Sequence, residues 1–438
     1  MKVLKFGGTS VGSPQRMKDV AKLITDGERK IVVLSAMSGT TNTLVEISDY
    51  LHKKNPDGAN EVINRLENKY KQHINELFST EEYRQKGMEL LKVRFELLRS
   101  YTKDLFTLFE ERIVLAQGEL LSTTMVNYYL QEQGVKSVLL PALDFMRTDK
   151  NAEPDLPYIK ERLAQQLVAN PDTENYITQG FICRNAYGEV DNLQRGGSDY
   201  SASLIGAAVK ADEIQIWTDI DGMHNNDPRI VDKTSPVRHL HFEEAAELAY
   251  FGAKILHPTC IQPAKYANIP VRLLNTMDPK AEGTMISNET EKGKIKAVAA
   301  KENITAIKIK SSRMLLAHGF LRKVFEIFEK YQTSIDMICT SEVGVSVSID
   351  NTKHLNEILD ELRKYGTVTV DHNMCIICVV GDLEWENVGF EAKALDAMRD
   401  IPVRMISFGG SNYNISFLVR ECDKKAALQS LSDQLFNN

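Results

Sequence analysis

Short apolar runs recur along the first 290 residues, each followed by a loop of small residues or by helical spacing. The run at residues 31–35 is uninterrupted, as in a strand buried on both faces of a parallel sheet, and the run at residues 2–6 is also too short for a helix. Similar runs follow at 136–141, 176–182, 214–219 and 269–274. Strand–loop–helix units in this order predict an α/β fold whose site lies at the carboxyl ends of the strands.

The pattern changes between about residues 58 and 133. Apolar residues recur there at spacings of three and four, as at Val62, Leu66 and Tyr70, with charged residues between them. This spacing is typical of amphipathic helices, so the segment is predicted to be a helical insertion with solvated charged faces. Gly118-Glu119 interrupts the spacing, and we expect the helical pattern to break at that point.

A polar linker at residues 287–294 precedes a different organisation. Residues 304–371 are predicted to form strand, helix, strand, strand, helix, strand, and residues 372–438 repeat this order without its last strand. The repeat is visible in apolar residues that recur 68 positions apart: Ile335, Met337 and Ile338, then Val403, Met405 and Ile406. A spare strand at 295–301 is predicted to complete the second copy, which would nest one unit inside the other.

Composition and charge narrow the class of protein. The chain has 438 residues and a net charge of −7, which gives no indication of a nucleic-acid or anionic-membrane partner. No apolar run approaches the roughly 18 residues of a membrane span, and the first residues do not form a signal peptide, so we expect a cytoplasmic enzyme. The six cysteines are scattered, and Cys375 and Cys378 are predicted to be buried thiols on one strand. The histidines at 239, 241 and 257 lack the further ligand that a metal site needs, so no metal ligands are predicted.

Two segments contain residue types that bind anions. Lys5-Phe-Gly-Gly-Thr-Ser (5–10) follows the first strand, where paired glycines allow backbone N–H groups to converge on an anion beside the Lys5 ammonium. Arg-Gly-Gly-Ser-Asp (195–199) opens a helix of small residues, and a helix N-terminus attracts negative charge. A bare Gly-Gly pair is more often a surface turn, so this interpretation depends on the neighbouring residues.

Four blocks taken in order resemble the signature of aspartate kinases, within the amino-acid kinase superfamily: residues 5–11, residues 35–42, Glu119 and residues 195–199. The tandem repeat resembles a pair of ACT domains, the small-molecule sensors attached to amino-acid enzymes. The resemblance covers essentially the whole chain. It implies an α/β amino-acid-kinase-type sandwich over residues 1–290, a mainly parallel sheet flanked by helices, followed by two βαββαβ ferredoxin-like ACT domains.

The resemblance also implies an activity, which is transfer of the ATP γ-phosphoryl group to the side-chain carboxylate of L-aspartate. This is the first step of lysine, threonine and methionine biosynthesis, and Mg²⁺ would accompany the ATP. The chemistry agrees, because such a substrate needs a cation for its α-carboxylate and an anion for its ammonium group, which Arg195 and Glu119 offer. The implied catalytic residues are Lys5, Gly7, Gly8 and Asp199. The implied aspartate-binding residues are Ser35, Thr41, Glu119, Arg195 and Ser198. The implied nucleotide-binding residues are Lys5, Gly7, Gly8, Thr218, Asp219, Arg229 and Lys254.

Feedback inhibition by L-lysine through the first ACT copy is a further implication, because this copy resembles lysine-sensitive aspartate kinases. Asp336 and Glu342 would offer carboxylates to the ε-ammonium group, and the helix start would offer N–H groups to the α-carboxylate. The second copy has Gly410 where the first has Glu342, so one copy is expected to bind the effector and the other to pack against it, in a homodimer paired through the ACT domains. The implied effector residues are Met314, Gly319, Phe320, Leu321, Ser334, Ile335, Asp336, Thr340, Ser341 and Glu342.

Two alternatives remain open. A kinase for glutamate or acetylglutamate is the nearest, although such enzymes usually lack tandem ACT units and the Phe-Gly-Gly-Thr-Ser opening. The other is a catalytically inactive amino-acid sensor, which would be favoured by loss of Lys5, Arg195 or Asp199, and all three are present. No P-loop or protein-kinase motif occurs. No dehydrogenase-like unit follows the repeat, so a monofunctional enzyme is expected.

Overall fold

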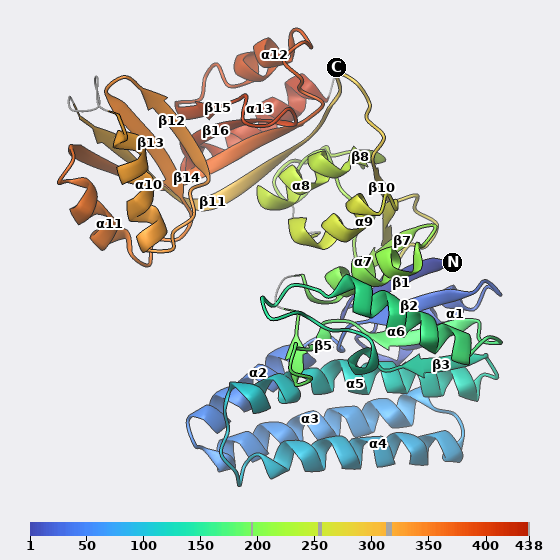
Figure 1. Cartoon of the computed structure of the whole chain (residues 1–438). Coiled ribbons are helices and arrows are strands. Elements are labelled where there is room, and N and C mark those ends of the chain that lie inside the picture. The colour runs from blue at the N-terminus through green and yellow to red at the C-terminus, as the bar shows by residue number, and fades with distance from the viewer. Residues whose placement is uncertain (194–195, 253–255, 312–317, 437–438) are drawn as a thin grey trace. The chain divides into compact units, whose positions relative to one another are not determined.

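The structure of the chain is a computed structural model that describes residues 1–193, 196–252, 256–311 and 318–436. The chain divides into two compact units (Figure 1). The first comprises Met1–Met223 and Leu256–Asn288, and the second comprises His224–Ile255 and Glu289–Asn438.

A mainly parallel sheet forms the centre of the first unit. Among the described residues its strands run in the order β3-β4-β2-β1-β7-β9-β10, with every neighbouring pair parallel except β9 and β10. β2 is buried along its whole length, as its continuous apolar pattern predicts. The strands are β1 (Lys2–Phe6), β2 (Lys30–Leu34), β3 (Ser137–Leu140), β4 (Asn175–Gln179), β7 (Ile214–Thr218), β9 (Val271–Asn275) and β10 (Thr284–Ser287), with a separate hairpin of β5 (Ile182–Arg184) and β6 (Val190–Asn192).

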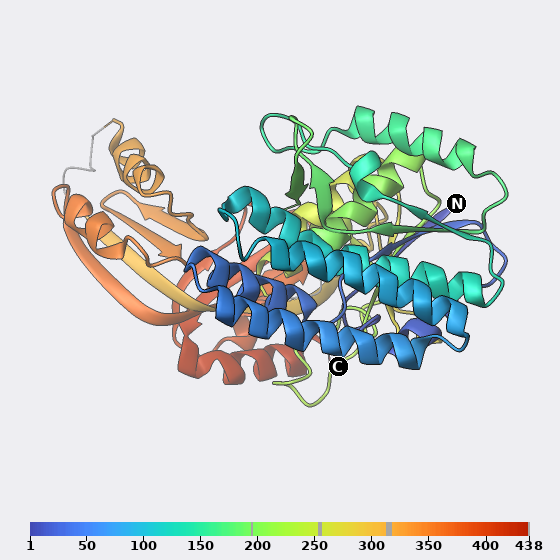
Figure 2. The same cartoon turned by 90° about the horizontal axis from the view of Figure 1, so that it is seen from below.

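The predicted helical insertion consists of long helices that share the core of the first unit. α3 packs on α2 and α4, and α4 packs on α5, as the blue to teal helices in Figure 2 show. Gly118-Glu119 lies inside α5, so the expectation of a break there is wrong. The glycine allows close packing, since a Cβ atom at this position would lie 2.7 Å from the Ala36 Cβ. The helices of this unit are α1 (Pro14–Ile24), α2 (Thr40–His52), α3 (Pro56–Leu77), α4 (Glu81–Ser100), α5 (Leu108–Glu132), α6 (Leu156–Ala169), α7 (Gly197–Val209) and α9 (Gln262–Tyr266), with short 3₁₀ turns at Ala142–Asp144 and Pro258–Ile261.

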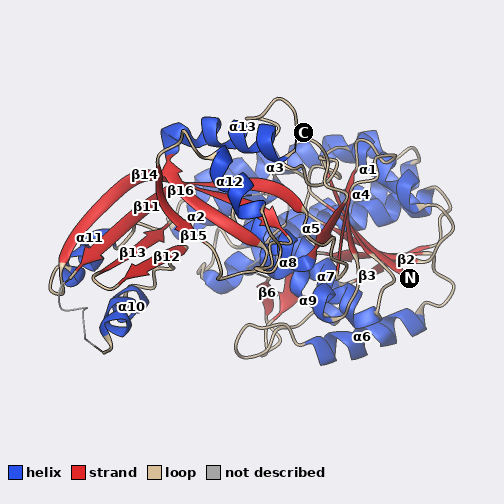
Figure 3. Ribbon diagram, turned by 90° about the horizontal axis from the view of Figure 1, so that it is seen from above, coloured by secondary structure: helices blue, strands red, loops and turns tan. Residues whose placement is uncertain are grey.

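An antiparallel sheet organises the second unit, in the order β12-β13-β11-β14-β16-β15 among the described residues. β11 and β14 are long enough to serve both halves of this sheet (Figure 3). The predicted spare strand is the first half of β11, and it pairs with Ile376–Gly381 of β14. The strands are β11 (Ile295–Lys310), β12 (Met337–Ser341), β13 (Gly344–Ile349), β14 (Thr367–Gly381), β15 (Val403–Ser407) and β16 (Asn414–Arg420).

Helices cover this sheet in two separate apolar cores. One core includes Val324 of α10 and Ile358 of α11, and the other includes Ala394 of α12 and Leu428 of α13. The helices are α10 (Phe320–Lys330), α11 (Leu355–Leu362), α12 (Phe390–Ala397) and α13 (Lys424–Leu435), with a 3₁₀ turn at Glu421–Asp423. The fold class is therefore the predicted one, an α/β unit with a mainly parallel sheet and an ACT-type α+β unit. The predicted border between copies at 371/372 lies within β14, and the limits of the functional domains stay a prediction.

Residues 224–255, which we predicted within a domain of residues 1–290, group with the second unit. They contain β8 (His239–His241) and α8 (Phe242–Tyr250), and His241 is the N-cap of this helix. Cys375 and Cys378 are fully buried free thiols, as predicted. Within the described part of the chain, no group of three His, Cys, Asp or Glu side chains could hold a metal ion, and no helix is long and apolar enough to cross a membrane.

Candidate active site

Glycine and hydroxyl residues follow neighbouring strands of the parallel sheet at its carboxyl edge. Gly7 and Gly8 come directly after β1, and Ser35 follows β2. Thr218 ends β7 on the other side of β1. Because β1, β2 and β7 are parallel, these residues lie along one edge, as the sequence predicts.

Lys5 and Asp199 form an ion pair at this edge. The Lys5 Nζ atom lies 2.7 Å from Asp199 Oδ1, and Lys5 is only 8% exposed. Asp199 belongs to the first turn of α7, which begins after Gly196 in the left-handed conformation (φ 66°). A Cβ atom on Gly7 would lie 3.4 Å from Lys5 Nζ, so the Gly7 backbone and the ammonium group adjoin. The Gly7 N–H itself donates to the Trp217 carbonyl at 3.3 Å, so the group that can attract a phosphate here is the Lys5 ammonium beside the N-terminus of α7.

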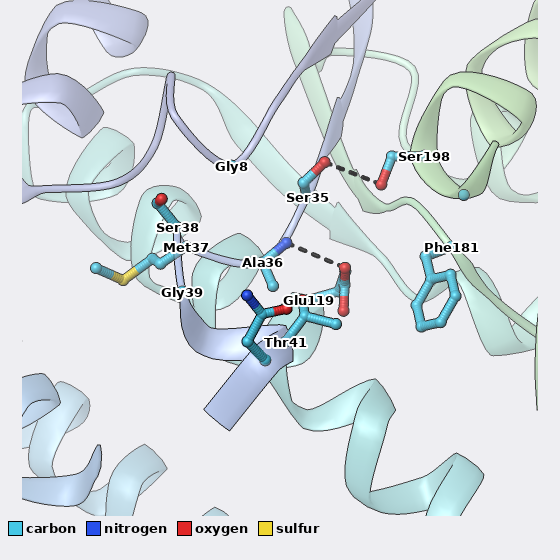
Figure 4. A pocket seen from close by; sticks show the side chains of 12 residues that line it. Gly8, Ser35, Ala36, Met37, Ser38, Gly39, Thr41, Glu119, Phe181 and Ser198 are labelled. Carbon is cyan, nitrogen blue, oxygen red and sulfur yellow. Dashed lines mark hydrogen bonds between the residues drawn. The ribbon is translucent and has the colours of Figure 1, made fainter. Parts of the chain in front are cut away.

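A cavity of about 330 Å³ is lined by Gly8, which follows β1, and by Ser198, the residue before Asp199 in α7 (Figure 4). Its wall contains two side-chain contacts between distant segments: Ser35 Oγ donates a hydrogen bond to Ser198 Oγ (3.0 Å), and the Ala36 N–H donates one to Glu119 Oε1 (3.1 Å). The lining residues are Gly8, Ser35, Ala36, Met37, Ser38, Gly39, Thr41, Asn42, Glu119, Phe181, Gly197 and Ser198. The structure thus brings four of the five predicted aspartate-binding residues, Ser35, Thr41, Glu119 and Ser198, to one cavity.

Glu119 provides the negative charge of the cavity wall. It is 4% exposed, and its Oε2 atom has no hydrogen-bond partner among the described residues. Burial raises the pKa of this carboxyl to about 7, because desolvation penalises the charged form. An ammonium group entering the cavity would satisfy Oε2 and offset the cost of the buried charge.

Close packing positions Ser198 in the cavity. A Cβ atom on Gly180, just after β4, would lie 2.4 Å from the Ser198 side chain, so only glycine fits there. Phe181 follows with φ 67°, an unusual conformation for an aromatic residue, and its N–H donates to Ser201 Oγ of α7 at 2.9 Å. Sequence reasoning missed Gly180 and Phe181 as site residues. Their only signal is their place at the end of a predicted strand, since nothing local marks a strained backbone.

The predicted nucleotide-binding residues, unlike the aspartate-binding ones, belong to different units of the structure. Thr218 and the exposed Asp219 lie at the end of β7, and the Thr218 hydroxyl accepts the Ile220 N–H at 3.3 Å. Arg229 belongs to the second unit, where it is exposed and pairs with Asp227. The predicted site residues Arg195, Lys254 and Met314 lie outside the described residues.

The predicted effector residues that the structure describes lie within the first ACT copy, at the start of α10 and in and around β12. Gly319 (φ 81°) precedes α10, Phe320 is buried, and Leu321 is exposed. Ser334 and Ile335 lead into β12, at whose end Thr340, Ser341 and Glu342 are exposed.

Asp336 differs from the expectation of a carboxylate free to bind an effector. It pairs with Lys301 at 2.7 Å and accepts a hydrogen bond from Tyr250 at 3.0 Å, and burial raises the pKa of its carboxyl. Of the two carboxylate oxygens of Asp336, Oδ1 makes these contacts, and Oδ2 has no hydrogen-bond partner among the described residues. Of the two predicted effector carboxylates, Asp336 and Glu342, only Glu342 is exposed.

Comparison with known proteins identifies the family. The amino acid kinase family matches residues 1–275, and an ACT domain matches residues 377–435. Across its full length, this chain is 34% identical to the protein named Aspartokinase 1, chloroplastic, of Arabidopsis thaliana, 80% of which it covers. The chain belongs to the aspartokinase family.

Other aspartokinases agree over the full length. The chain is 33% identical to the lysine-sensitive aspartokinase 3 of Escherichia coli, over 99% of both chains. The crystal structure of E. coli aspartokinase III in complex with aspartate and ADP is similar over 100% of both chains, with a TM-score of 0.84 and 33% identity. The family and the fold thus agree with the interpretation of the sequence.

Proposed function

We propose that this protein is an aspartate kinase, which transfers the γ-phosphoryl group of ATP to the side-chain carboxylate of L-aspartate and yields 4-phospho-L-aspartate and ADP. The observation that carries this proposal is the cavity with the buried Glu119 carboxylate in its wall, beside the Lys5–Asp199 pair. The aspartokinase III structure, which holds aspartate and ADP, supports the same pair of ligands here.

In this proposal each part of the site has one task. Glu119 binds the ammonium group of aspartate, and Ser35, Thr41 and Ser198 bind polar atoms of the same substrate. Arg195 binds the α-carboxylate, by resemblance to the family. The side-chain carboxylate of free aspartate, with a pKa near 3.9, is ionised at neutral pH, so the nucleophile needs no general base.

Charge stabilisation is then the main catalytic task. A carboxylate and a triphosphate repel each other, and negative charge on the transferring phosphoryl group must be neutralised. Lys5 and the Gly8 N–H supply positive charge, while Asp199 holds the Lys5 ammonium in place and the Gly7 N–H, which donates to the Trp217 carbonyl, fixes the turn. Thr218, Asp219, Arg229 and Lys254 bind the nucleotide.

The described residues fit Mg²⁺ only as an ion brought by the nucleotide. They include no cluster of three acidic or histidine ligands, whereas Mg²⁺ keeps several waters and commonly binds through phosphates with one or two carboxylates. Asp199 and Asp219 are the carboxylates that could contribute. Bound Mg²⁺ would neutralise phosphate charge.

A coupled ADP-release assay with several acceptors tests the activity. We expect ATP turnover with L-aspartate and at least tenfold lower kcat/KM with L-glutamate and N-acetyl-L-glutamate, because one extra methylene misplaces the acceptor carboxylate relative to the ATP phosphates. Equal or faster turnover with either longer substrate would favour the other amino-acid kinases. The absence of turnover with all three would favour the inactive sensor.

The raised pKa of Glu119 predicts a pH dependence of aspartate binding. Below about pH 7 this carboxyl takes up a proton and loses the charge that binds the ammonium group. The KM for aspartate should therefore rise as the pH falls, by up to about tenfold per unit well below the pKa, while the KM for ATP changes little. Initial rates from roughly pH 5.5 to 8.5 measure this. A flat KM for aspartate over that range would contradict the role of Glu119.

Feedback inhibition by L-lysine belongs to the same proposal, supported by the likeness to a relative named for its lysine sensitivity. We expect millimolar lysine to inhibit the wild type and Glu342→Ala to reduce the sensitivity at least tenfold, because an exposed carboxylate at the end of β12 would be lost. Lysine titrations at fixed substrate concentrations measure this shift.

Glu357→Ala is the matched control, since Glu357 is an exposed carboxylate on α11 of the same copy. Its sensitivity should equal that of the wild type. A wild type that ignores millimolar lysine, or an unchanged response in Glu342→Ala, would contradict this effector site.

The assembly and location are part of the proposal. We expect a homodimer that pairs through the ACT domains and acts in the cytoplasm. Sedimentation of the full chain with and without lysine measures the assembly, and a monomer under both conditions would contradict it.

A further inference from the structure

The segment that carries Arg229 packs against the second half of the ACT sheet. Val231 is 1% exposed and belongs to the apolar core that includes Phe417 of β16 and Leu428 of α13. The backbone of this segment is also anchored, because the Val298 N–H of β11 donates a hydrogen bond to the Asn225 carbonyl at 2.8 Å. The sequence predicts this loop as part of the kinase domain of residues 1–290. In the structure, contacts with the second ACT copy stabilise its conformation.

Asn226 makes the most specific of these attachments. Its side chain is buried, its Nδ2 donates to the Leu428 carbonyl of α13 at 3.0 Å, and its Oδ1 accepts the Asp227 N–H at 2.9 Å. One partner is an acceptor and the other a donor, so the orientation of the amide is determined by its surroundings. The Asn226 amide thus serves both partners at once.

The contacts continue from Asp227 to Arg229. Asp227 Oδ1 accepts both the backbone N–H and the Nε–H of Arg229, each at 2.9 Å, and its Oδ2 accepts from the guanidinium at 2.7 Å. The Arg229 guanidinium also holds the pKa of the Asp227 carboxyl below its usual range. An unbroken series of hydrogen bonds therefore runs from the α13 backbone to the charged end of Arg229.

An exposed arginine has many rotamers, and fixing one of them before binding saves the entropy of ordering it. Asp227 fixes the guanidinium, and Asn226 fixes the backbone from which Asp227 and Arg229 project. Arg229 is therefore preorganised by a contact that leads to α13.

We propose that Asn226 is a positioning residue for nucleotide binding, which holds the Asp227–Arg229 pair in its binding conformation by anchoring the loop to α13. The inference rests on the proposed function, in which Arg229 binds ATP. The proposal assigns different roles to the two ACT copies. The second copy supports the nucleotide-binding loop, whereas the first copy has the carboxylates for an effector.

Asn226→Ala tests the proposal through the separate Michaelis constants. We expect the KM for ATP to rise by about five- to tenfold, as for the loss of one positioning interaction, with less than a twofold change in the KM for aspartate. Ser430→Ala is the matched control, because Ser430 also lies on α13 but bonds to Ala397, away from the loop. It should loosen α13 similarly and leave both constants at the wild-type values.

A double-mutant cycle with Arg229→Ala separates this inference from the function on which it rests. If Asn226 acts through Arg229, the KM for ATP of the double variant should match that of Arg229→Ala alone. Additive effects, or a raised KM for ATP in Arg229→Ala but not in Asn226→Ala, would overturn the role of Asn226 and leave the nucleotide role of Arg229 intact. If neither variant changes this constant while wild type shows aspartate-dependent turnover, both roles fail and the kinase activity stands.

Asp227→Asn covers the case in which Asn226→Ala does not fold. Asp227 is partly exposed, so this substitution spares the buried core while weakening the pairing with Arg229. It should raise the KM for ATP selectively, as Asn226→Ala does. An unchanged KM for ATP in folded Asp227→Asn would overturn the proposed series of contacts.

Discussion

Lys5→Ala is expected to lower kcat by about 100- to 1,000-fold, the range seen when one donor is removed from a site that stabilises developing charge. Lys5 is almost buried and held at 2.7 Å from Asp199, so its ammonium group need not reorganise when charge develops on the transferring phosphoryl group. An interaction that strengthens in the transition state affects kcat more than substrate binding. The KM for ATP should therefore rise much less than kcat falls, as steady-state kinetics with both substrates will measure.

Lys2→Ala is the matched control, because Lys2 lies on the same strand but pairs with the exposed Glu28 at 3.1 Å. Its kcat should stay within twofold of the wild type. A Lys5→Ala enzyme with a raised KM for ATP and an unchanged kcat would show that Lys5 only binds the nucleotide.

Glu119→Gln is expected to raise the KM for aspartate by roughly 30-fold or more, since loss of one partner of a buried charge pair costs about 2–5 kcal/mol. The amide keeps the shape of the side chain, and its carbonyl can still accept the Ala36 N–H. What it lacks is the charge that binds the substrate ammonium group. The KM for ATP should stay near its wild-type value, and the pH dependence of aspartate binding should disappear.

Glu111→Gln serves as the control, because Glu111 lies on the same helix but pairs with His52 away from the cavity. Its constants should match those of the wild type. If Glu119→Gln weakened both substrates equally, Glu119 would be a structural residue of α5 and not the ammonium-binding group.

The sequence predicts most of the strands and part of the site, for physical reasons that these residues illustrate. β2 is an unbroken apolar run, and a strand buried on both faces hardly permits another pattern. Lys5 and Asp199 are far apart in the chain, and the sequence marks each by a neighbouring glycine pair. Their ion pair depends on the fold, because α7 follows the separate β5–β6 hairpin and not a strand of the parallel sheet.

Other features depend on contacts that no local pattern contains. The continuity of β14 through both ACT copies depends on pairing with β11 and β16, so the repeat alone suggested a border inside it. The pairing of Asp336 with Lys301 joins residues 35 positions apart, whereas the sequence shows only a strand-end carboxylate. The attachment of Asn226 to α13 spans 202 positions, and its donor and acceptor geometry appears only in the fold.

Trapping of the reaction product with hydroxylamine tests the central claim most directly. An acyl phosphate reacts with hydroxylamine to give a hydroxamate, so the wild-type enzyme with ATP, Mg²⁺ and L-aspartate should form the β-hydroxamate of aspartate in step with ADP release. Mass spectrometry against the α- and β-isomers identifies the carboxylate that received the phosphoryl group. The account predicts the β-isomer, and its loss in Lys5→Ala. ADP release with no hydroxamate, or formation of the α-isomer, would contradict it.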